Sequence, residues 1–536
     1  MTEIFVTRKL NGSNIKCIKC NRRRRINSSH ICYYCYGINS LIVNSGNINI
    51  DSFIKGTQSP NNKTFNSHLV WVPFEEFKDL EKIGQGGFSQ IFRATWKINK
   101  GINYEGTVKR STKQKIVLKV LNNSQNVDTE FLNELKLTFQ IGKIDHTNTY
   151  DNYQIINCYG VTQDPQTKNY AFILKYMPNG DLHHFIHKNF EKFTWRSKIV
   201  YLFSIVDGIH TIHYQKIIHR DLHSGNILSR KNIDDSLNSN TRDHTVISDL
   251  GFSKPANIDS NLSRESQIYG IIPYMAPELF KNQPYSYASD IYSLGMIMWQ
   301  LTSGHRPFHD QEHGPKLIID ILDGKRPEIT EDTPECWANL MKRCWHPDPS
   351  QRPTIQEIGE LSKEFQFYNI YLYWVDAVKK LNPEIYGVWF EFNEAEKKRL
   401  EMVESKKPFV KNPGYEHPNS RYYSTSLNSM LESINSTITD LFSNDNLLSN
   451  DHFDIMDFNP DQKNNFENSD HNSSAENSKK HFLNELLEEE IIEDQNDFKR
   501  RKIVEYFNEC FVDEEKLLKF TAHVNLILPS GDNCQR

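Results

Sequence analysis

The segment that decides the fold reads IHRDLHSGNIL, from Ile218 to Leu228. Its polar centre lies between apolar ends, which is typical of a loop held between two short strands. Asp221 can accept a hydrogen bond from a substrate hydroxyl, and Asn226, five residues later, offers a neutral oxygen to a divalent cation. Asp and Asn are also common in surface turns, so the assignment depends on the motifs around it. The segment predicts two parts of a phosphoryl-transfer site.

Size, charge and hydropathy limit what the chain can be. A chain of 536 residues is too long to fold around one hydrophobic core. At a typical ~150 residues per domain, we expect about three domains or segments. Apolar residues make up 38% of the chain, which permits a globular core, and the net charge of −5 does not indicate a nucleic-acid binder. Met1–Leu10 has no secretory h-region, and no apolar run is long enough to span a membrane. We therefore expect a soluble intracellular protein.

Two cysteine pairs near the N-terminus have the spacing of a zinc site. Cys17 and Cys20 form one C-x2-C pair, and Cys32 and Cys35 form another after eleven intervening residues. Each pair can present two thiolates to one tetrahedral ion, so residues 1–38 are predicted to form a structural zinc ribbon or knuckle. The alternative is four unligated thiols in a flexible leader. The run Arg22–Arg25 can contact nucleic-acid phosphates, although such runs are also solvated surface or part of a targeting signal.

A glycine-rich stretch in Leu80–Ala94 reads as strand, turn and strand. Gly84, Gly86 and Gly87 allow the backbone to approach a phosphate chain closely, and Ile91 can pack on a flat ligand ring. Glycines serve any tight hairpin in the same way. The position of this stretch upstream of the catalytic segment is what favours a phosphate loop.

A single lysine, Lys119, interrupts the apolar strand predicted over Lys115–Leu121. A buried charge needs a partner of opposite sign. The helix predicted next supplies two carboxylates, and we favour Glu134 over Glu130 because Glu134 lies beside the apolar stripe. The polar stretch Lys97–Gln114 before this strand is longer than a usual connection and is expected to be an exposed insertion.

Taken in order, these segments resemble the catalytic domain of protein kinases, from about Phe77 to Phe365. His219–Asn226 matches the family pattern H-R-D-L-x-x-x-N at every fixed position. The other matching stretches are the glycine loop, with Ser89 and Ile91 in its third-glycine and valine positions, the Lys119 strand, Asp249-Leu250-Gly251, Ala276-Pro277-Glu278, Asp290–Gly295 and Gln351–Thr354. The body of the domain is most similar to the tyrosine-kinase-like group of serine/threonine kinases.

The resemblance implies a role for each matching side chain. The residues expected to carry phosphoryl transfer are Asp221, Lys119, Asn226 and Asp249, of which Asn226 and Asp249 bind Mg2+. The residues expected to hold ATP are Ile83, Gly84, Gly86, Gly87, Ile91, Lys119, Glu134, Lys175 and Met177. Leu174 takes the gatekeeper position, Asp290 steadies the catalytic loop, and Arg352 pairs with Glu278.

The implied fold class is α+β, a bilobal protein-kinase fold with a β-rich small lobe and a helical large lobe. An N-terminal zinc ribbon and a largely disordered C-terminal tail flank it. The expected parts are 1–38 zinc ribbon, 39–70 linker, 71–368 kinase domain (small lobe 71–177, large lobe 178–368), 369–411 helical extension, 412–480 low-complexity tail, and 481–536 amphipathic helix and C-terminal segment.

Three positions depart from the kinase pattern. His223 stands where serine/threonine kinases have a lysine, Ile271 where they have a hydroxyl residue, and Leu250 where a phenylalanine is usual. We expect a kinase that transfers the γ-phosphate of ATP to Ser or Thr hydroxyls of protein substrates. The alternatives are a nucleotide-binding pseudokinase scaffold, a tyrosine or dual-specificity kinase, and a zinc-ribbon nucleic-acid adaptor that carries the kinase fold.

The C-terminal part is rich in Asn, Ser and Asp from Asn412 to Lys480, a composition that buries too little apolar surface to stay ordered. Leucines and isoleucines among the acids of Leu483–Asp497 suggest an amphipathic helix that docks a partner, with a solvated helix as the alternative. We expect a cytoplasmic location, with the nucleus as a second one because of the basic run Lys499–Lys502.

Overall fold

The computed structural model describes residues 44–57, 69–98, 112–125, 129–141, 154–230, 244–255, 268–370 and 383–433, with a few isolated positions besides. All of them belong to the first of two compact units, Met1–Leu447. The four N-terminal cysteines and the helix predicted near residue 485 lie outside the described residues. No helix of the described part is long and apolar enough to cross a membrane.

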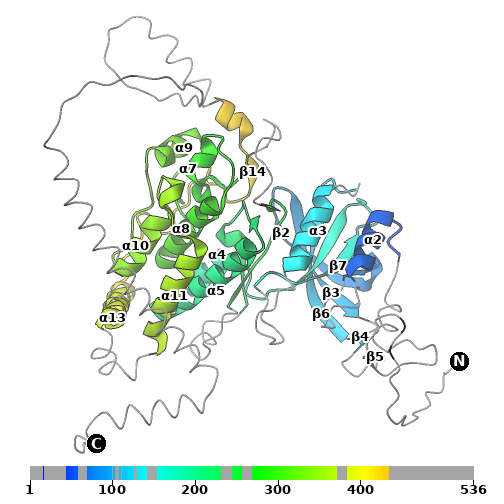
Figure 1. Ribbon diagram of the computed structural model, residues 1–536, viewed down its shortest axis with the longest axis horizontal. Coiled ribbons are helices and arrows are strands. Elements are labelled where there is room, and N and C mark those ends of the chain that lie inside the picture. The colour runs from blue at the N-terminus through cyan, green and yellow to red at the C-terminus, as the bar shows by residue number, and fades with distance from the viewer. Residues whose placement is uncertain are drawn as a thin grey trace, which may run out of the picture. The chain divides into compact units, whose positions relative to one another are not determined.

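The small lobe is built on one six-stranded sheet (Figure 1). Its strands, in spatial order, are β1 Val70–Trp71, β7 Cys158–Gln163, β8 Tyr170–Lys175, β6 Thr112–Leu121, β3 Ser89–Ile98 and β2 Phe77–Gln85. Neighbouring strands are antiparallel, except that β1 runs parallel to β7. A short hairpin, β4 Gly101–Ile102 and β5 Val108–Lys109, lies within the predicted insertion, whose ends extend β3 and β6.

Two helices pack on this sheet, α3 Thr129–Ile141 and α2 Ile48–Thr57. The prediction that residues 39–70 form only a linker is therefore wrong for α2. Ile50 and Ile54, one helical turn apart, are buried against Phe131 and Leu135 of α3. The side chain of Asn47 accepts the Ile50 amide at 3.3 Å and caps the helix, which an asparagine-rich composition obscures.

The large lobe is helical, as expected, and follows the sheet in the chain (Figure 1). Its helices are α4 Leu182–Asn189, α5 Trp195–Tyr214, α7 Pro277–Phe280, α8 Tyr287–Ser303, α9 Pro315–Leu322, α10 Glu335–Cys344, α11 Ile355–Ile370 and α13 Pro383–Glu404. Its short 3-10 helices are η2 Phe190–Lys192, η3 Ser224–Asn226, η4 Ile272–Tyr274 and η5 Pro349–Gln351, and a further one, η1 Phe74–Glu76, belongs to the small lobe. Helices α5 and α8 are buried along nearly their whole length and form the centre of the core. The bilobal α+β fold class is confirmed.

Two strand pairs hold the loop that carries Asp221. β9 Ile217–Ile218 pairs with β12 Lys254–Pro255, and β10 Ile227–Ser229 pairs with β11 Thr245–Ile247, both antiparallel. The apolar ends of the segment Ile218–Leu228 are thus largely buried strands, with only Leu228 half-buried, and they fix both ends of the polar loop between them.

The beginning of the predicted disordered tail is packed on the large lobe. Residues 412–433 are described, and β14 Thr425–Ser426 (labelled in Figure 1) forms part of them. β14 pairs antiparallel with β13 Tyr269–Gly270. Leu427 and Leu431, four residues apart, are buried in the large-lobe core. The prediction of a low-complexity tail from Asn412 is wrong for this part, because two leucines and a backbone pairing suffice to dock a segment whose average composition is polar.

Candidate active site

The catalytic loop places Asp221 and Asn226 next to each other. The side-chain amide of Asn226 donates to the backbone carbonyl of Asp221 at 2.9 Å, so its oxygen is left to face a ligand. Both side chains are buried. The loop closes on the 3-10 helix η3, and the Gly225 amide donates to the His223 ring Nδ1 at 3.1 Å.

The buried carboxylate of Asp290 fixes the backbone conformation of the catalytic loop. Asp290, in the first turn of α8, accepts the His219 amide at 2.8 Å, the Arg220 amide at 3.0 Å and the His213 ring Nε2 at 2.9 Å. Arg220 adopts the left-handed backbone conformation, φ 73°, which costs about 1–3 kcal/mol for a non-glycine residue. Asp290 therefore stabilises a strained backbone directly before Asp221.

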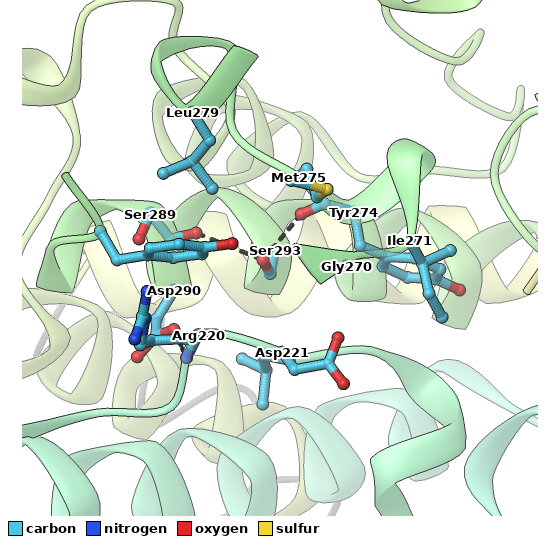
Figure 2. A pocket seen from close by; sticks show the side chains of 12 residues that line it. Arg220, Asp221, Gly270, Ile271, Tyr274, Met275, Leu279, Ser289, Asp290 and Ser293 are labelled. Carbon is cyan, nitrogen blue, oxygen red and sulfur yellow. Dashed lines mark hydrogen bonds between the residues drawn. The ribbon is translucent and has the colours of Figure 1, made fainter. Parts of the chain in front are cut away.

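Figure 2 shows a small pocket between this loop and the end of the activation segment, residues 249–278. The Asp221 carboxylate is directed toward Ile271, while Asp290 lies beside Arg220. Ile271 is buried and offers Asp221 no hydrogen bond where a hydroxyl was expected from the kinase pattern. The Arg220 guanidinium lies over the ring of Tyr285, 4.0 Å from its centre.

Lys119 forms a three-charge cluster in which it and Glu134 are buried and Asp249 is half-buried. Its Nζ lies 2.7 Å from Glu134 Oε1 and 2.7 Å from Asp249 Oδ1. Burial would lower the pKa of Lys119, but the charges of Asp249 and Glu134 more than offset burial and raise that pKa. Burial is also the main reason why the pKa of Glu134 is raised, against the attraction of Lys119. The structure thus brings together the lysine of β6, the carboxylate of α3 and the aspartate that follows β11.

The glycine turn between β2 and β3 contacts two backbone carbonyl groups, those of Ser89 and Ser424. The Gly86 amide donates to the Ser89 carbonyl at 2.8 Å. A Cβ on Gly87 would stand 2.3 Å from the carbonyl oxygen of Ser424, so only glycine fits there. Ile83 is 45% exposed and Ile91 is half-buried, so both have apolar surface left for a ligand ring to cover.

The segment after β8 carries the residues expected to bind adenine. The Lys175 amide already donates to the Asn157 carbonyl at 2.9 Å, so it is engaged within the fold. The Met177 side chain packs with Ile156 and Val246, and its carbonyl accepts the Gly180 amide at 3.1 Å.

Asp221 carries two contacts that bear on its charge. His223 Nε2 lies 3.8 Å from Asp221 Oδ2, and Ser424 Oγ lies 2.8 Å from Oδ1 and 2.6 Å from Oδ2. Burial would raise the pKa of Asp221, but His223 and the hydrogen bond from Ser424 outweigh burial and lower that pKa. Asp221 is therefore ionised near neutral pH. Sequence reasoning missed Ser424 because nothing within the polar tail marks one serine among many.

The other residues that match the kinase pattern, Arg352, Glu278 and Leu250, lie in the large lobe and stabilise the structure around the site. Arg352 makes a bidentate ion pair with Glu278, both contacts at 2.7 Å, and both side chains are buried. Leu250 is buried in the large-lobe core, so a leucine fills the position after Asp249. No group of three or more potential metal ligands among His, Cys, Asp and Glu occurs in the described part of the chain. Mg2+ usually takes only one or two protein carboxylates, with phosphates and water as its other ligands, so Asp249 and Asn226 fit it.

Comparison with known proteins agrees with this geometry. Curated proteins similar to this chain include pats1 of Dictyostelium discoideum, described as a serine/threonine-protein kinase, with 28% identity over 305 residues, 54% of this chain and 8% of that protein. A second similar protein is R826 of Acanthamoeba polyphaga mimivirus, described as a serine/threonine-protein kinase/receptor. It is 30% identical over 291 residues, which cover 54% of this chain and 15% of that protein. The serine/threonine-protein kinase STY17 of Arabidopsis thaliana is 25% identical over 293 residues, 54% of this chain and 45% of that protein.

This chain spans less than half the length of each of these relatives. The family model described as protein tyrosine and serine/threonine kinase matches residues 77–361, more than half of the 536 residues. That range begins at β2 and ends within α11, so it contains Lys119, Glu134, Asp221 and Asp249. The chain belongs to the protein tyrosine and serine/threonine kinase family.

Proposed function

We propose that this chain is an ATP-dependent protein kinase that transfers the γ-phosphate to Ser or Thr hydroxyls of protein substrates. The observation that carries the proposal is the ion pair of buried Lys119 with both buried Glu134 and half-buried Asp249. A charged lysine held between two carboxylates, beside a glycine turn, is suited to receive phosphate groups. The same site also holds Asp221 and Asn226, whose side chains are suited to orient an acceptor hydroxyl and to bind Mg2+.

Each side chain of the site has a separate task. Asp221 accepts the hydrogen bond of the attacking hydroxyl and orients it, and its lowered pKa keeps it ionised for that purpose. Glu134 positions Lys119 against the phosphates of ATP, and the glycine turn brings backbone amides near them. Asn226 and Asp249 are suited to hold Mg2+, which when bound neutralises charge on the phosphates.

The acceptor class rests on two observations. The relatives named above are described as serine/threonine kinases. In this chain a serine hydroxyl also reaches both carboxylate oxygens of Asp221. His223 occupies the lysine position of other serine/threonine kinases and lies 3.8 Å from Asp221, where its ring can interact with the same substrate. A serine-sized acceptor therefore fits the site as it stands.

The test is transfer of radiolabelled γ-phosphate from ATP to a mixture of generic protein substrates by the full chain, followed by phosphoamino-acid analysis. We expect labelled phosphoserine and phosphothreonine with the wild type and none with Asp221→Asn. Asp320→Asn, which changes the half-buried partner of exposed Lys325, is the matched control and should keep full activity. Absence of transfer together with retained ATP binding would establish a pseudokinase scaffold instead, and labelled phosphotyrosine would establish the other specificity.

We further propose that Cys17, Cys20, Cys32 and Cys35 bind one structural Zn2+. The support is their paired C-x2-C spacing. Metal analysis of the purified full chain should give one zinc per molecule, lost in Cys17→Ser/Cys20→Ser and retained in Cys534→Ser. Equal zinc content in all three proteins would refute the site.

We also propose that the protein is cytoplasmic, with the nucleus as a second location. The free thiols of Cys158, Cys336 and Cys344 fit a reducing compartment. The segment 481–536 is proposed to dock a partner through its amphipathic helix, and the kinase domain is taken as residues 71–368 with a helical extension to 411. Imaging of the full chain with and without the basic run Lys499–Lys502 tests the location.

A further inference from the structure

A serine from the C-terminal segment occupies the position of a substrate hydroxyl. Ser424 Oγ lies 2.8 Å and 2.6 Å from the two carboxylate oxygens of Asp221, and its side chain is buried. One hydroxyl proton is shared between two oxygens of the group proposed to orient the attacking oxygen. Neither Thr425, half-buried, nor Ser426, exposed, makes a hydrogen bond to Asp221 among the described contacts.

The backbone around Ser424 binds in the manner of an extended peptide. β14 pairs antiparallel with β13 of the activation segment, with Thr425 opposite Gly270 and Ser426 opposite Tyr269. The Leu427 amide donates to the Ile268 carbonyl at 2.9 Å, and the Ile268 amide donates to the side chain of Asn428 at 2.8 Å. Addition of a strand to an exposed edge is a common mode of peptide recognition.

The same segment is anchored on both sides of Ser424. Upstream, the Arg306 guanidinium lies 3.8 Å from the centre of the Tyr422 ring and forms an ion pair with Glu416. Tyr422 also donates its hydroxyl to the Pro307 carbonyl at 2.9 Å. Downstream, Leu427 is buried in the large-lobe core. Ser424 is therefore held between two fixed points rather than placed there by one contact.

The phosphate loop closes over this serine. The position of a Cβ on Gly87 would be 2.3 Å from the Ser424 carbonyl oxygen, so the glycine turn touches the segment directly. Phe88, next in the turn, packs edge-on against Phe252 and Tyr269 of the activation segment, with ring centres 5.1 Å and 5.2 Å apart. Ser424 thus meets Asp221 through its hydroxyl and the glycine turn proposed to hold ATP through its backbone carbonyl.

We propose that Ser424 is a phosphorylation site that the chain modifies within its own molecule. The inference rests on the proposed function, because ATP must bind beside Lys119. The Ser424 oxygen attacks the γ-phosphorus of ATP, the bond from that phosphorus to the bridging oxygen breaks, and ADP leaves with the bond electrons. The hydroxyl proton passes to Asp221 and then to water. The products are phosphoserine 424 and ADP, so no further reactant is needed.

Phosphorylation then opens to other proteins the substrate groove, by which we mean the edge of β13 and the place beside Asp221 that the segment around Ser424 occupies. A phosphoserine carries a charge of about −1.5 to −2 near neutral pH, and Asp221 is itself negative. At the present separation of Ser424 and Asp221, the phosphate and the carboxylate repel each other. The hydroxyl that donated a hydrogen bond to Asp221 is also lost. The segment 416–431 consequently leaves the groove, which external substrates share with it.

The test starts from the full chain freed of phosphate by a phosphatase that is then removed. It is incubated with Mg2+ and ATP, and the phosphate on each peptide is counted by mass spectrometry. We expect close to one phosphate per molecule at Ser424, at a rate per molecule that does not change over a hundredfold dilution. Ser426→Ala, two residues along with an exposed side chain, is the matched control and should label Ser424 at the wild-type rate.

The kinetics of an external substrate provide the second readout. Wild-type chain should phosphorylate a generic protein after a lag that matches Ser424 labelling. Ser424→Ala should show no lag, and its KM for the external substrate before any labelling should be lower by about tenfold to a hundredfold, because hydrogen bonds to a charged carboxylate are lost. Equal KM values and equal lags would overturn the docking of this segment in the substrate groove.

The outcomes separate this inference from the proposed function. Transfer to the external protein without phosphate on Ser424 would overturn self-modification and leave the kinase assignment standing. Labelling of Ser424 that accelerates with protein concentration would overturn transfer within one molecule. Absence of transfer to any acceptor, in Ser424→Ala as well as in the wild type, would refute both proposals together.

Discussion

Replacement of Asp290 by asparagine tests how the catalytic loop is held. The carboxylate accepts three hydrogen bonds, from the amides of His219 and Arg220 and from the ring of His213, and its side chain is buried. Oδ2 accepts two of them and Oδ1 accepts the third. An asparagine has the same size but only one acceptor oxygen. Its NH2 group therefore replaces one carboxylate oxygen and faces at least one of the three donors, which loses its acceptor.

The cost follows from these contacts. One buried donor left unsatisfied costs about 1–3 kcal/mol, and two hydrogen bonds to a neutral instead of a charged acceptor lose about 1 kcal/mol each. We therefore expect Asp290→Asn to lower the free energy of unfolding by about 3–5 kcal/mol, which many domains tolerate. Arg220 is also released from its left-handed conformation, so Asp221 shifts, and a displacement of about 1 Å lowers kcat by roughly a hundredfold.

The assay combines denaturant unfolding of the full chain with steady-state phosphate transfer. Asp320→Asn is the control because its pair with exposed Lys325 contributes about 0–1 kcal/mol. Loss of stability and of kcat in Asp290→Asn alone is expected. If both variants keep the wild-type unfolding midpoint and kcat, Asp290 does not hold the loop and the reasoning from its hydrogen bonds is wrong.

Three further changes test other parts of the molecule. Glu134→Gln leaves Lys119 with one carboxylate and should lower kcat/KM for ATP by about tenfold to a hundredfold in steady-state assays; unchanged kinetics would count against the Lys119 cluster. Asp332→Asn removes the carboxylate 3.4 Å from the buried Lys198 ammonium and should cost about 3–5 kcal/mol in denaturant unfolding at pH 7. Burial lowers the pKa of Lys198 and Asp332 partly offsets that effect, so the folded variant releases the Lys198 proton at a lower pH than the folded wild type. The loss should therefore shrink as the pH rises between these two folded-state pKa values, both below the unfolded value of about 10.4; a loss that grows would contradict the sign. Ile50→Ala should destabilise the small lobe by about 2–5 kcal/mol while exposed Ile48→Ala should not, and equal unfolding midpoints would remove α2 from the folded domain.

The short motifs of the site could be predicted because their chemistry is local. Asp221 and Asn226 lie within one loop, and Lys119 interrupts an apolar strand, so each is visible in a few residues. The choice of Glu134 as partner followed from helical spacing, and the structure has that ion pair at 2.7 Å. The fold class followed from the resemblance of these ordered motifs to the protein kinase family.

The parts that escaped prediction depend on contacts far apart in the chain. Helix α2 has only Ile50 and Ile54 to bury within an asparagine-rich stretch, and the surface that covers them comes from α3 and the sheet. Ser424 lies 203 residues from Asp221, and its segment is fixed by backbone pairing with β13, which any sequence can make. Average composition describes neither case, because a few buried side chains decide whether a polar segment docks.

One nucleotide and its metal ion are proposed to bind among Lys119, Asp249 and Asn226. Calorimetric titration of ATP into the full chain, with and without Mg2+, tests this proposal most directly. We expect Mg2+ to strengthen ATP binding to the wild type. In Asp249→Asn the gain from Mg2+ should disappear, whereas the control Asp320→Asn should keep it. The same Mg2+ dependence in wild type and Asp249→Asn, or no ATP binding by the wild type, would contradict a shared site for nucleotide and metal.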